Sequence, residues 1–250
     1  HLNNRIAWYE NDGAADPSFT TRVVTSTVNR SEGVSAADMD GDGDIDVVSA
    51  GWDTPNIAWH ENDGNSPPSF TSHIVSNSDR GTQDVFLADI NGDGHVDIVG
   101  TAATDDRISW YKNDGNSEPT FTRQVLQDDA NNAFIVFAAD IDGDNDLDIL
   151  ATSKLDNTLS LFLNDGNEIP IFSQRTISLG ANPVGIHVAD IDGDSDLDLL
   201  TTAGGRFSWI ANILPDFGDA PSPYPVTLAQ NGARHDSKGP TLGNKRDHEQ

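Results

Sequence analysis

The chain of 250 residues carries 41 Asp and Glu residues against 14 Lys and Arg residues, which gives a formal net charge of −27. This acidic excess predicts no binding to nucleic acid or to an anionic membrane surface, because the chain lacks a basic footprint for phosphate groups. The absence of Cys excludes disulfides and thiolate metal sites, and no apolar run reaches the length of about 18 residues that a membrane-spanning helix needs.

One pattern returns along the chain with a nearly fixed period. The tripeptide Asn-Asp-Gly starts at Asn11, Asn62, Asn113 and Asn164, in steps of 51 residues. A Phe follows each tripeptide at the same distance, at Phe19, Phe70, Phe121 and Phe172. Self-similarity at such a period is typical of folds in which each repeat is one supersecondary unit.

The predicted elements of a unit follow one another in chain order. Ile6 and Trp8 alternate with period two ahead of the first Asn-Asp-Gly turn, and a further strand is predicted from Phe19 onward. Residues 34–38 (VSAAD) then lead into an acidic loop, and residues 45–51 (IDVVSAG) leave it as an aliphatic strand that we expect to be buried on both faces. Each later unit repeats these segments.

Short strands joined by Gly, Asn and Asp turns predict an all-β fold, a β-propeller of four-stranded blades of about 50 residues. We expect a part-blade over residues 1–30 and blades at about 31–80, 81–130, 131–180 and 181–214. Either terminal strands share one blade and close the ring, or the chain is a section of a larger, seven-bladed propeller. We favour the second interpretation, that the chain is a section of a larger propeller.

Four acidic loops, which read DMDGDGDID, DINGDGHVD, DIDGDNDLD and DIDGDSDLD, are predicted to bind about four Ca²⁺ ions. Asp or Asn stands at positions 1, 3, 5 and 9 of each loop, and position 7 offers its backbone carbonyl, so hard oxygen ligands alternate along a tight turn. The candidate ligands are Asp38, Asp40, Asp42, Asp44 and Asp46; Asp89, Asn91, Asp93, His95 and Asp97; Asp140, Asp142, Asp144, Asp146 and Asp148; and Asp190, Asp192, Asp194, Asp196 and Asp198.

Other interpretations of these loops are weaker. An EF-hand would need a bidentate carboxylate at position 12, where Ser49, Gly100, Ala151 and Thr201 stand. Merely solvated turns would not keep four carboxylate sets in register, because uncompensated carboxylates repel one another. Position 6 needs a left-handed backbone, which Gly43 and Gly94 accept readily, Asn145 accepts and Ser195 accepts less well, so the fourth loop is expected to be the weakest.

The loops and their flanks, such as ADMDGDGDIDVV and ADIDGDSDLDLL, resemble the FG-GAP/VCBS repeat family over about residues 1–214. This resemblance implies a β-propeller related to the head of integrin α-subunits, with Ca²⁺ bound between the first two strands of a blade. Residues 215–250 are rich in Pro and Gly and are predicted to be a linker or the start of a following module. Their DFGDAP, GARH and PTLG segments resemble the opening of a module of large bacterial surface and adhesin-like proteins.

Two functions are consistent with the sequence. The first is a calcium-stabilised binding or structural module of a secreted or cell-surface bacterial protein, joined to other domains of a larger chain, for adhesion or for recognition of an extracellular glycan or protein. The second is the propeller domain of an extracellular lyase or hydrolase that degrades polysaccharides. The second is less favoured, because the chain holds no HExxH, GxSxG or phosphate-loop motif. The residues that follow His1 show neither the charged segment nor the apolar run of an export signal, so we expect any such signal upstream.

Trp and Arg residues also recur at equivalent positions of the repeats. Trp8, Trp59, Trp110 and Trp209 could stack on sugars, but their alternation with apolar residues favours packing between blades. Arg5, Arg107 and Arg206 could form a ring for acidic sugars, but pairing with carboxylates is the simpler expectation.

Overall fold

The computed structural model describes residues 4–53, 56–193 and 196–211. These residues form 17 β-strands, and none of them forms a helix that could span a membrane. The strands are β1 (Ile6–Asn11), β2 (Phe19–Thr25), β3 (Ser31–Ala37), β4 (Asp46–Gly51), β5 (Ile57–Asn62), β6 (Phe70–Ser76), β7 (Thr82–Ala88), β8 (Asp97–Ala102), β9 (Arg107–Asn113), β10 (Phe121–Gln127), β11 (Ala133–Ala139), β12 (Asp148–Ser153), β13 (Thr158–Leu163), β14 (Ser173–Ser178), β15 (Pro183–Ala189), β16 (Asp198–Ala203) and β17 (Arg206–Ile210).

Strands that follow one another in the chain pair antiparallel in the sheets. Blade 1 is β3–β6, blade 2 is β7–β10 and blade 3 is β11–β14, each a four-stranded meander. Blade 4 is the three-stranded sheet β15–β17, and β1 pairs with β2 in a two-stranded sheet. The second strands β8 and β12 are buried at every residue, because both of their faces are covered by neighbouring blades, as their continuous aliphatic sequences predict.

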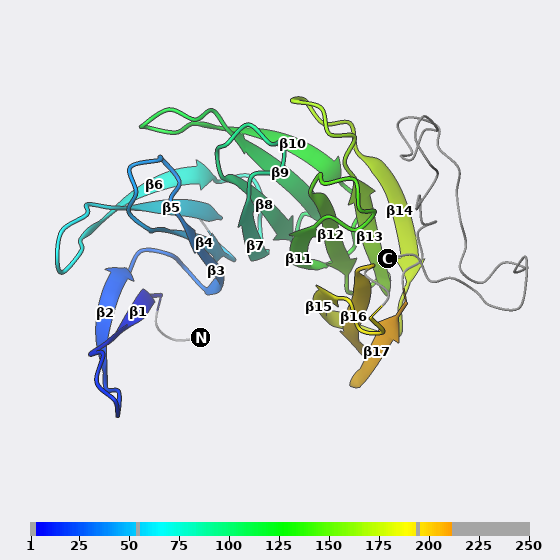
Figure 1. Ribbon diagram of the computed structural model, residues 1–250, viewed down its shortest axis with the longest axis horizontal. Helices are drawn as coiled ribbons and strands as arrows, with labels where there is room; N and C mark the ends of the chain where they lie inside the picture. The colour runs from blue at the N-terminus through cyan, green and yellow to red at the C-terminus, as the bar shows by residue number, and fades with distance from the viewer. Residues whose placement is uncertain (1–3, 54–55, 194–195, 212–250) are drawn as a thin grey trace, which may run out of the picture.

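The sheets fan out in an arc. Figure 1 shows β3, β7, β11 and β15 toward the inside of this arc and β6, β10 and β14 along its outside. The inner strands contact one another from blade to blade, β3 with β7, β7 with β11, and β11 with β15. Radial four-stranded antiparallel sheets are the architecture of a β-propeller, so the predicted fold class is confirmed.

The apolar core lies between blades. Trp59 of blade 1 packs in one cluster with Tyr111 of blade 2, and Trp110 of blade 2 packs in another with Phe162 of blade 3. Trp59 and Trp110 are each only 2% exposed, so they contribute to packing and do not form a sugar-stacking surface. Trp209 on β17 is 48% exposed, because no later blade among the described residues covers this side of its sheet.

The meander gives each blade two different ends. The acidic loops, named loop 1 (38–46), loop 2 (89–97), loop 3 (140–148) and loop 4 (190–198), connect first and second strands and lie at the same end as the Asn-Asp-Gly turns between third and fourth strands. We call this end the acidic face. The opposite face carries the β4–β5 and β6–β7 connections and their equivalents in the other blades. The predicted linker or module at 215–250 lies outside the described residues.

Candidate metal centres

The first aspartate of each acidic loop holds the turn together. Asp38 accepts hydrogen bonds from the backbone N–H groups of Gly41 (2.8 Å) and Gly43 (3.0 Å). Asp140 does the same for Gly143 (2.8 Å) and Asn145 (3.0 Å). Position 6 has the left-handed backbone that the sequence predicts, with φ of 97° at Gly43, 89° at Gly94 and 73° at Asn145. Ser195 lies outside the described residues.

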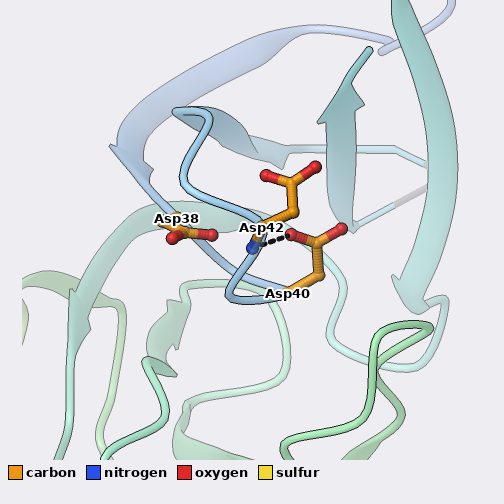
Figure 2. Close-up of side chains that lie close together, drawn as sticks. All are labelled: Asp38, Asp40 and Asp42. Carbon is orange, nitrogen blue, oxygen red and sulfur yellow. Dashed lines mark hydrogen bonds between the residues drawn. The ribbon is translucent and has the colours of Figure 1, made fainter. Parts of the chain in front are cut away.

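Three of the loops gather carboxylate oxygens around one point. In loop 1, ligand atoms of Asp38, Asp40 and Asp42 all lie within 4.8 Å of one another. Figure 2 shows these three side chains projecting from the single turn between β3 and β4, with the Asp42 N–H donating to Asp40 Oδ1 at 3.2 Å. Oxygen ligands at this spacing are the donor set that a hard cation such as Ca²⁺ requires.

Loops 3 and 4 form equivalent clusters with the position 9 aspartate. The clusters consist of Asp140, Asp142 and Asp148 in loop 3, and of Asp190, Asp192 and Asp198 in loop 4. Asp142 Oδ1 is buried and has no hydrogen-bond donor among the described residues. A buried anionic oxygen without a donor is costly unless a cation lies beside it. The residues of loops 1, 3 and 4 therefore fit a calcium ion, while Asp194 of loop 4 lies outside the described residues.

The electrostatics of loop 3 reflect the crowding of its carboxylates. Burial, with the neighbouring charges of Asp144 and Asp140, raises the pKa of Asp142 to about 6. Burial raises the pKa of Asp148 to about 7, although two backbone N–H donors act in the opposite direction. A bound divalent cation favours the charged forms of both groups.

The aspartates at position 9 have a second role that ligand spacing did not reveal. Asp46 is 1% exposed and accepts hydrogen bonds from the N–H groups of Met39 (3.0 Å) and Asn62 (2.8 Å). Asp97 and Asp148 make the same two bonds in their own blades. The position 9 carboxylates of loops 1, 2 and 3 thus tie each of these loops to the end of its third strand, whether or not they also contact a cation.

The side chains at position 7 lie against the Asn-Asp-Gly turn of the same blade. A Cβ atom built on Gly64 would collide with the carboxylate of Asp44, and one on Gly166 would collide with Asp146. His95 of loop 2 is exposed and lies over Gly115 in the same way. Its imidazole therefore packs on the turn. Asp196 of loop 4 is half-buried.

The asparagines of the Asn-Asp-Gly turns are functional residues that the sequence presented only as turn formers. Asn113 of blade 2 donates from Nδ2 to the carbonyl of Val96 in its own loop (3.0 Å) and to that of Met39 in loop 1 (2.9 Å). Asn164 of blade 3 bonds Ile90 of loop 2 in the same manner, at 2.7 Å. These amides join loop 2 to loop 1 and loop 3 to loop 2. The sequence did contain a signal for this role, because the Asn of the turn recurs at the same position in every repeat.

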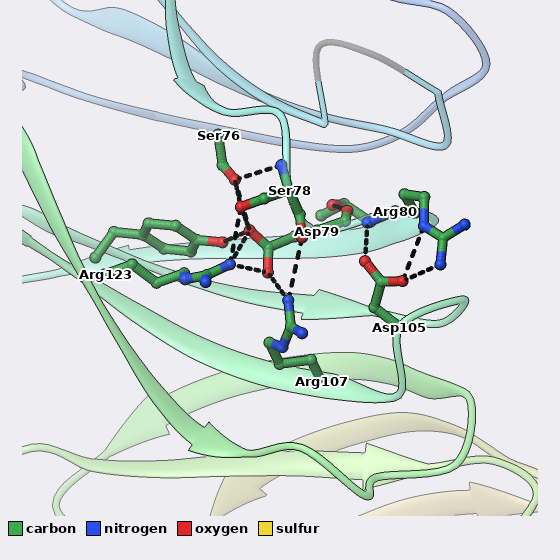
Figure 3. A network of polar contacts seen from close by, with 9 residues as sticks. Ser76, Ser78, Asp79, Arg80, Asp105, Arg107 and Arg123 are labelled. Atoms are coloured by element: carbon green, nitrogen blue, oxygen red, sulfur yellow. Dashed lines mark hydrogen bonds and ion pairs between the residues drawn. The ribbon is translucent and has the colours of Figure 1, made fainter.

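The opposite face holds a charged cluster between blades 1 and 2, which Figure 3 shows. Asp79 is 2% exposed, pairs with Arg107 (3.1 Å) and Arg123 (3.0 Å), and accepts a hydrogen bond from the Tyr111 hydroxyl (2.7 Å). Burial would raise the pKa of Asp79, but hydrogen bonds from Ser76, Tyr111 and Arg107 outweigh burial and hold it below its usual value. Arg107 is therefore paired with a carboxylate, as the simpler expectation held.

Radial four-stranded sheets with an acidic loop in every blade define a propeller built from acidic-loop repeats. The FG-GAP-like repeat family matches the chain over residues 2–49, 38–100, 89–151 and 149–201. The chain belongs to this family, which confirms the resemblance seen in its loops.

Comparison with other proteins finds similar solved structures but no curated relative. No curated protein sequence matches the chain. Among solved structures, the fold resembles that of an Agrocybe aegerita lectin described as specifically recognising non-reducing terminal N-acetylglucosamine. The TM-score is 0.55 and the sequence identity 19%, over 84% of this chain and 58% of the lectin chain. At this identity the likeness concerns the fold alone, and the chain spans less than two thirds of the lectin.

Proposed function

We propose that the chain is a calcium-stabilised binding module of a larger secreted or cell-surface bacterial protein, and that it recognises a glycan or a protein. The observation that carries the calcium part is the convergence of three carboxylates in each of loops 1, 3 and 4, within 4.8 Å, together with the buried, donor-free Asp142 Oδ1. Bound Ca²⁺ would supply the positive charge that offsets repulsion among these carboxylates. In loop 1 the residues that hold it are Asp38, Asp40 and Asp42.

The opposite face is the proposed recognition surface. Its connections carry side chains that differ from blade to blade, unlike the repeated acidic face. The guanidinium of Arg30 lies 4.6 Å from the ring centre of Trp52, and Lys154 Nζ lies 4.4 Å from that of Phe134. Aromatic rings beside charged groups offer stacking and hydrogen bonding to sugars and peptides. The fold likeness to a lectin supports a glycan as the first ligand to test.

Thermal unfolding in CaCl₂ and in EDTA tests the calcium part. Each occupied site stabilises the folded state by RT ln(1 + [L]/Kd), which is about 2.7 kcal/mol at a hundredfold excess over Kd. We therefore expect a clearly lower Tm in EDTA. Equal Tm values in the two buffers would refute calcium stabilisation.

A glycan array tests recognition. We expect binding to a restricted set of glycans in CaCl₂, and a loss of that binding in EDTA as the blades lose their support. Arg30→Ala/Trp52→Ala should weaken binding at an unchanged calcium content, because both residues lie on the face away from the loops. An array without any bound glycan would refute glycan recognition and leave a protein as the ligand.

A further inference from the structure

Loop 2 differs in charge from the other three loops. It has Asn91 at position 3 and His95 at position 7, where the other loops have aspartates at both positions. Blade 2 also has Lys112 directly before its Asn-Asp-Gly turn, where blade 1 has Glu61 and blade 3 has Leu163. Two negative charges are therefore missing from the loop, and one positive charge has been added beside it.

The added charge reaches the ligand position of the loop. Lys112 Nζ lies 3.2 Å from Asp93 Oδ2, and the two side chains are only 29% and 20% exposed. Asn91 Nδ2 donates to the same oxygen at 2.9 Å, and Asp93 Oδ1 accepts from the His95 N–H at 3.1 Å. Both oxygens of Asp93 are thus engaged. In loop 1, by contrast, Asp42 Oδ1 accepts from the Asp44 N–H at 2.9 Å, and Oδ2 has no donor among the described residues.

The amide of Asn91 is held in an orientation that points its donor group at Asp93. Its Nδ2 also donates to the Glu168 carbonyl of blade 3 at 3.1 Å, so rotating the amide to offer its oxygen would give up two hydrogen bonds. Asn91 Oδ1 is itself buried without a donor. Because this oxygen is neutral, its burial costs less than that of a carboxylate oxygen and does not require a cation. No three acidic or histidine ligand atoms of loop 2, which is described in full, approach one another as closely as those of loops 1, 3 and 4.

Loop 2 nevertheless keeps a backbone hydrogen-bond set like that of its neighbours, without the bond from the N–H of position 4. Asp89 accepts from the N–H groups of Asp93 (3.1 Å) and Gly94 (2.8 Å), and Asp97 joins the loop to Asn113 at 2.7 Å. We propose that loop 2 binds no calcium, because the Lys112 ammonium supplies the positive charge there, and that the chain binds three calcium ions. This inference rests on the proposed calcium binding of loops 1, 3 and 4.

The number of bound ions tests the inference. The ratio of calcium to protein is measured by atomic emission spectrometry after gel filtration in micromolar free Ca²⁺. We expect three ions in the wild type, two in Asp42→Ala and in Asp144→Ala, and still three in Asp93→Ala. Four ions in the wild type, falling to three in Asp93→Ala, would overturn this inference and leave the proposed function intact. A ratio of zero in every variant would overturn both.

A gain of binding tests the role of the two substituted residues. Asn91→Asp/Lys112→Leu gives blade 2 the residues of blade 3 at these two positions, and we expect the ratio of calcium to protein to rise from three to four. Lys154→Leu removes the same charge on the opposite face, so its ratio should stay at three. A double variant that remains at three would show that Asn91 and Lys112 are not what excludes calcium, and would overturn the assignment of that role to Lys112.

Discussion

Asn113 in the turn of blade 2 donates a hydrogen bond to the backbone carbonyl of Met39 in the acidic loop of blade 1, across 74 residues of sequence and at 2.9 Å. Asn164 repeats this contact from blade 3 to Ile90 at 2.7 Å. Loops 1, 2 and 3 are therefore joined in one hydrogen-bonded row along the acidic face. A substitution in one turn should therefore also alter the conformation of the acidic loop in the preceding blade.

The first prediction concerns this bond. Asn113→Ala removes a buried amide and leaves the carbonyls of Met39 and Val96 without their donor, so we expect a loss of about 2 to 4 kcal/mol in the free energy of unfolding. Urea denaturation measures it. Asn77→Ala, at an exposed asparagine on the opposite face, is the matched control and should change stability by less than about 0.5 kcal/mol. Equal effects of the two substitutions would contradict the role of Asn113.

The second prediction separates two glycines with the same backbone conformation. Gly13 and Gly64 have φ of 72° and 66°, but only at Gly64 would a Cβ collide with a side chain, that of Asp44. Gly13→Ala should cost about 1 to 2 kcal/mol from the left-handed backbone alone. Gly64→Ala should cost more and should also weaken calcium binding at loop 1, which isothermal titration calorimetry can follow. Unchanged calcium affinity in Gly64→Ala would show that the position 7 side chain does not shape the loop.

The third prediction concerns the carboxylate between blades 1 and 2. Asp79→Ala would leave Arg107, Arg123 and the Tyr111 hydroxyl without their buried partner, and we expect a cost of about 3 to 5 kcal/mol. Asp128→Ala, at an exposed aspartate, removes the same charge and should be nearly neutral. Urea denaturation of both variants makes the comparison, and a small effect at Asp79 would mean that its arginines find other partners.

The fourth prediction is the pH dependence of that contribution. The pKa of Asp79 is lower in the folded chain than the ordinary value of an Asp side chain, so the folded state binds this proton less tightly than the unfolded state. The stability that Asp79 contributes is therefore present above about pH 4 and is lost as the pH falls through the folded pKa. The difference in unfolding free energy between the wild type and Asp79→Asn should be flat from about pH 5 to 7 and shrink below about pH 4. A difference that grows on acidification would contradict the sign.

The sequence predicted those features that recur at one period. The strand types and the left-handed backbone at Gly43, Gly94 and Asn145 repeat in register, so each copy supports the others. The packing of Trp59 and Trp110 followed from their alternation along the third strands. The fold class and the backbone conformation of the loops were therefore accessible without coordinates.

Features that occur once, or that join distant segments, were not accessible. Asp79 stands where the neighbouring repeats have Val28 and Ala130, so no periodic signal marked it as the partner of Arg123. The bond from Asn113 to Met39 depends on how blades dock. The Asn at position 91, where the other loops have Asp, could be interpreted only after the structure placed Lys112 beside Asp93. Such contacts are set by packing between units, which a single repeat does not encode.

The turn asparagines Asn113 and Asn164 both donate in one direction, from a turn to the loop of the blade made before it. A growing chain therefore places the acceptor carbonyl before the donor amide is synthesised, and domains fold largely in the order of their synthesis. We expect each new blade to dock on a completed one, so that assembly of the arc proceeds from its N-terminal blade toward its C-terminal blade without waiting for the last strand.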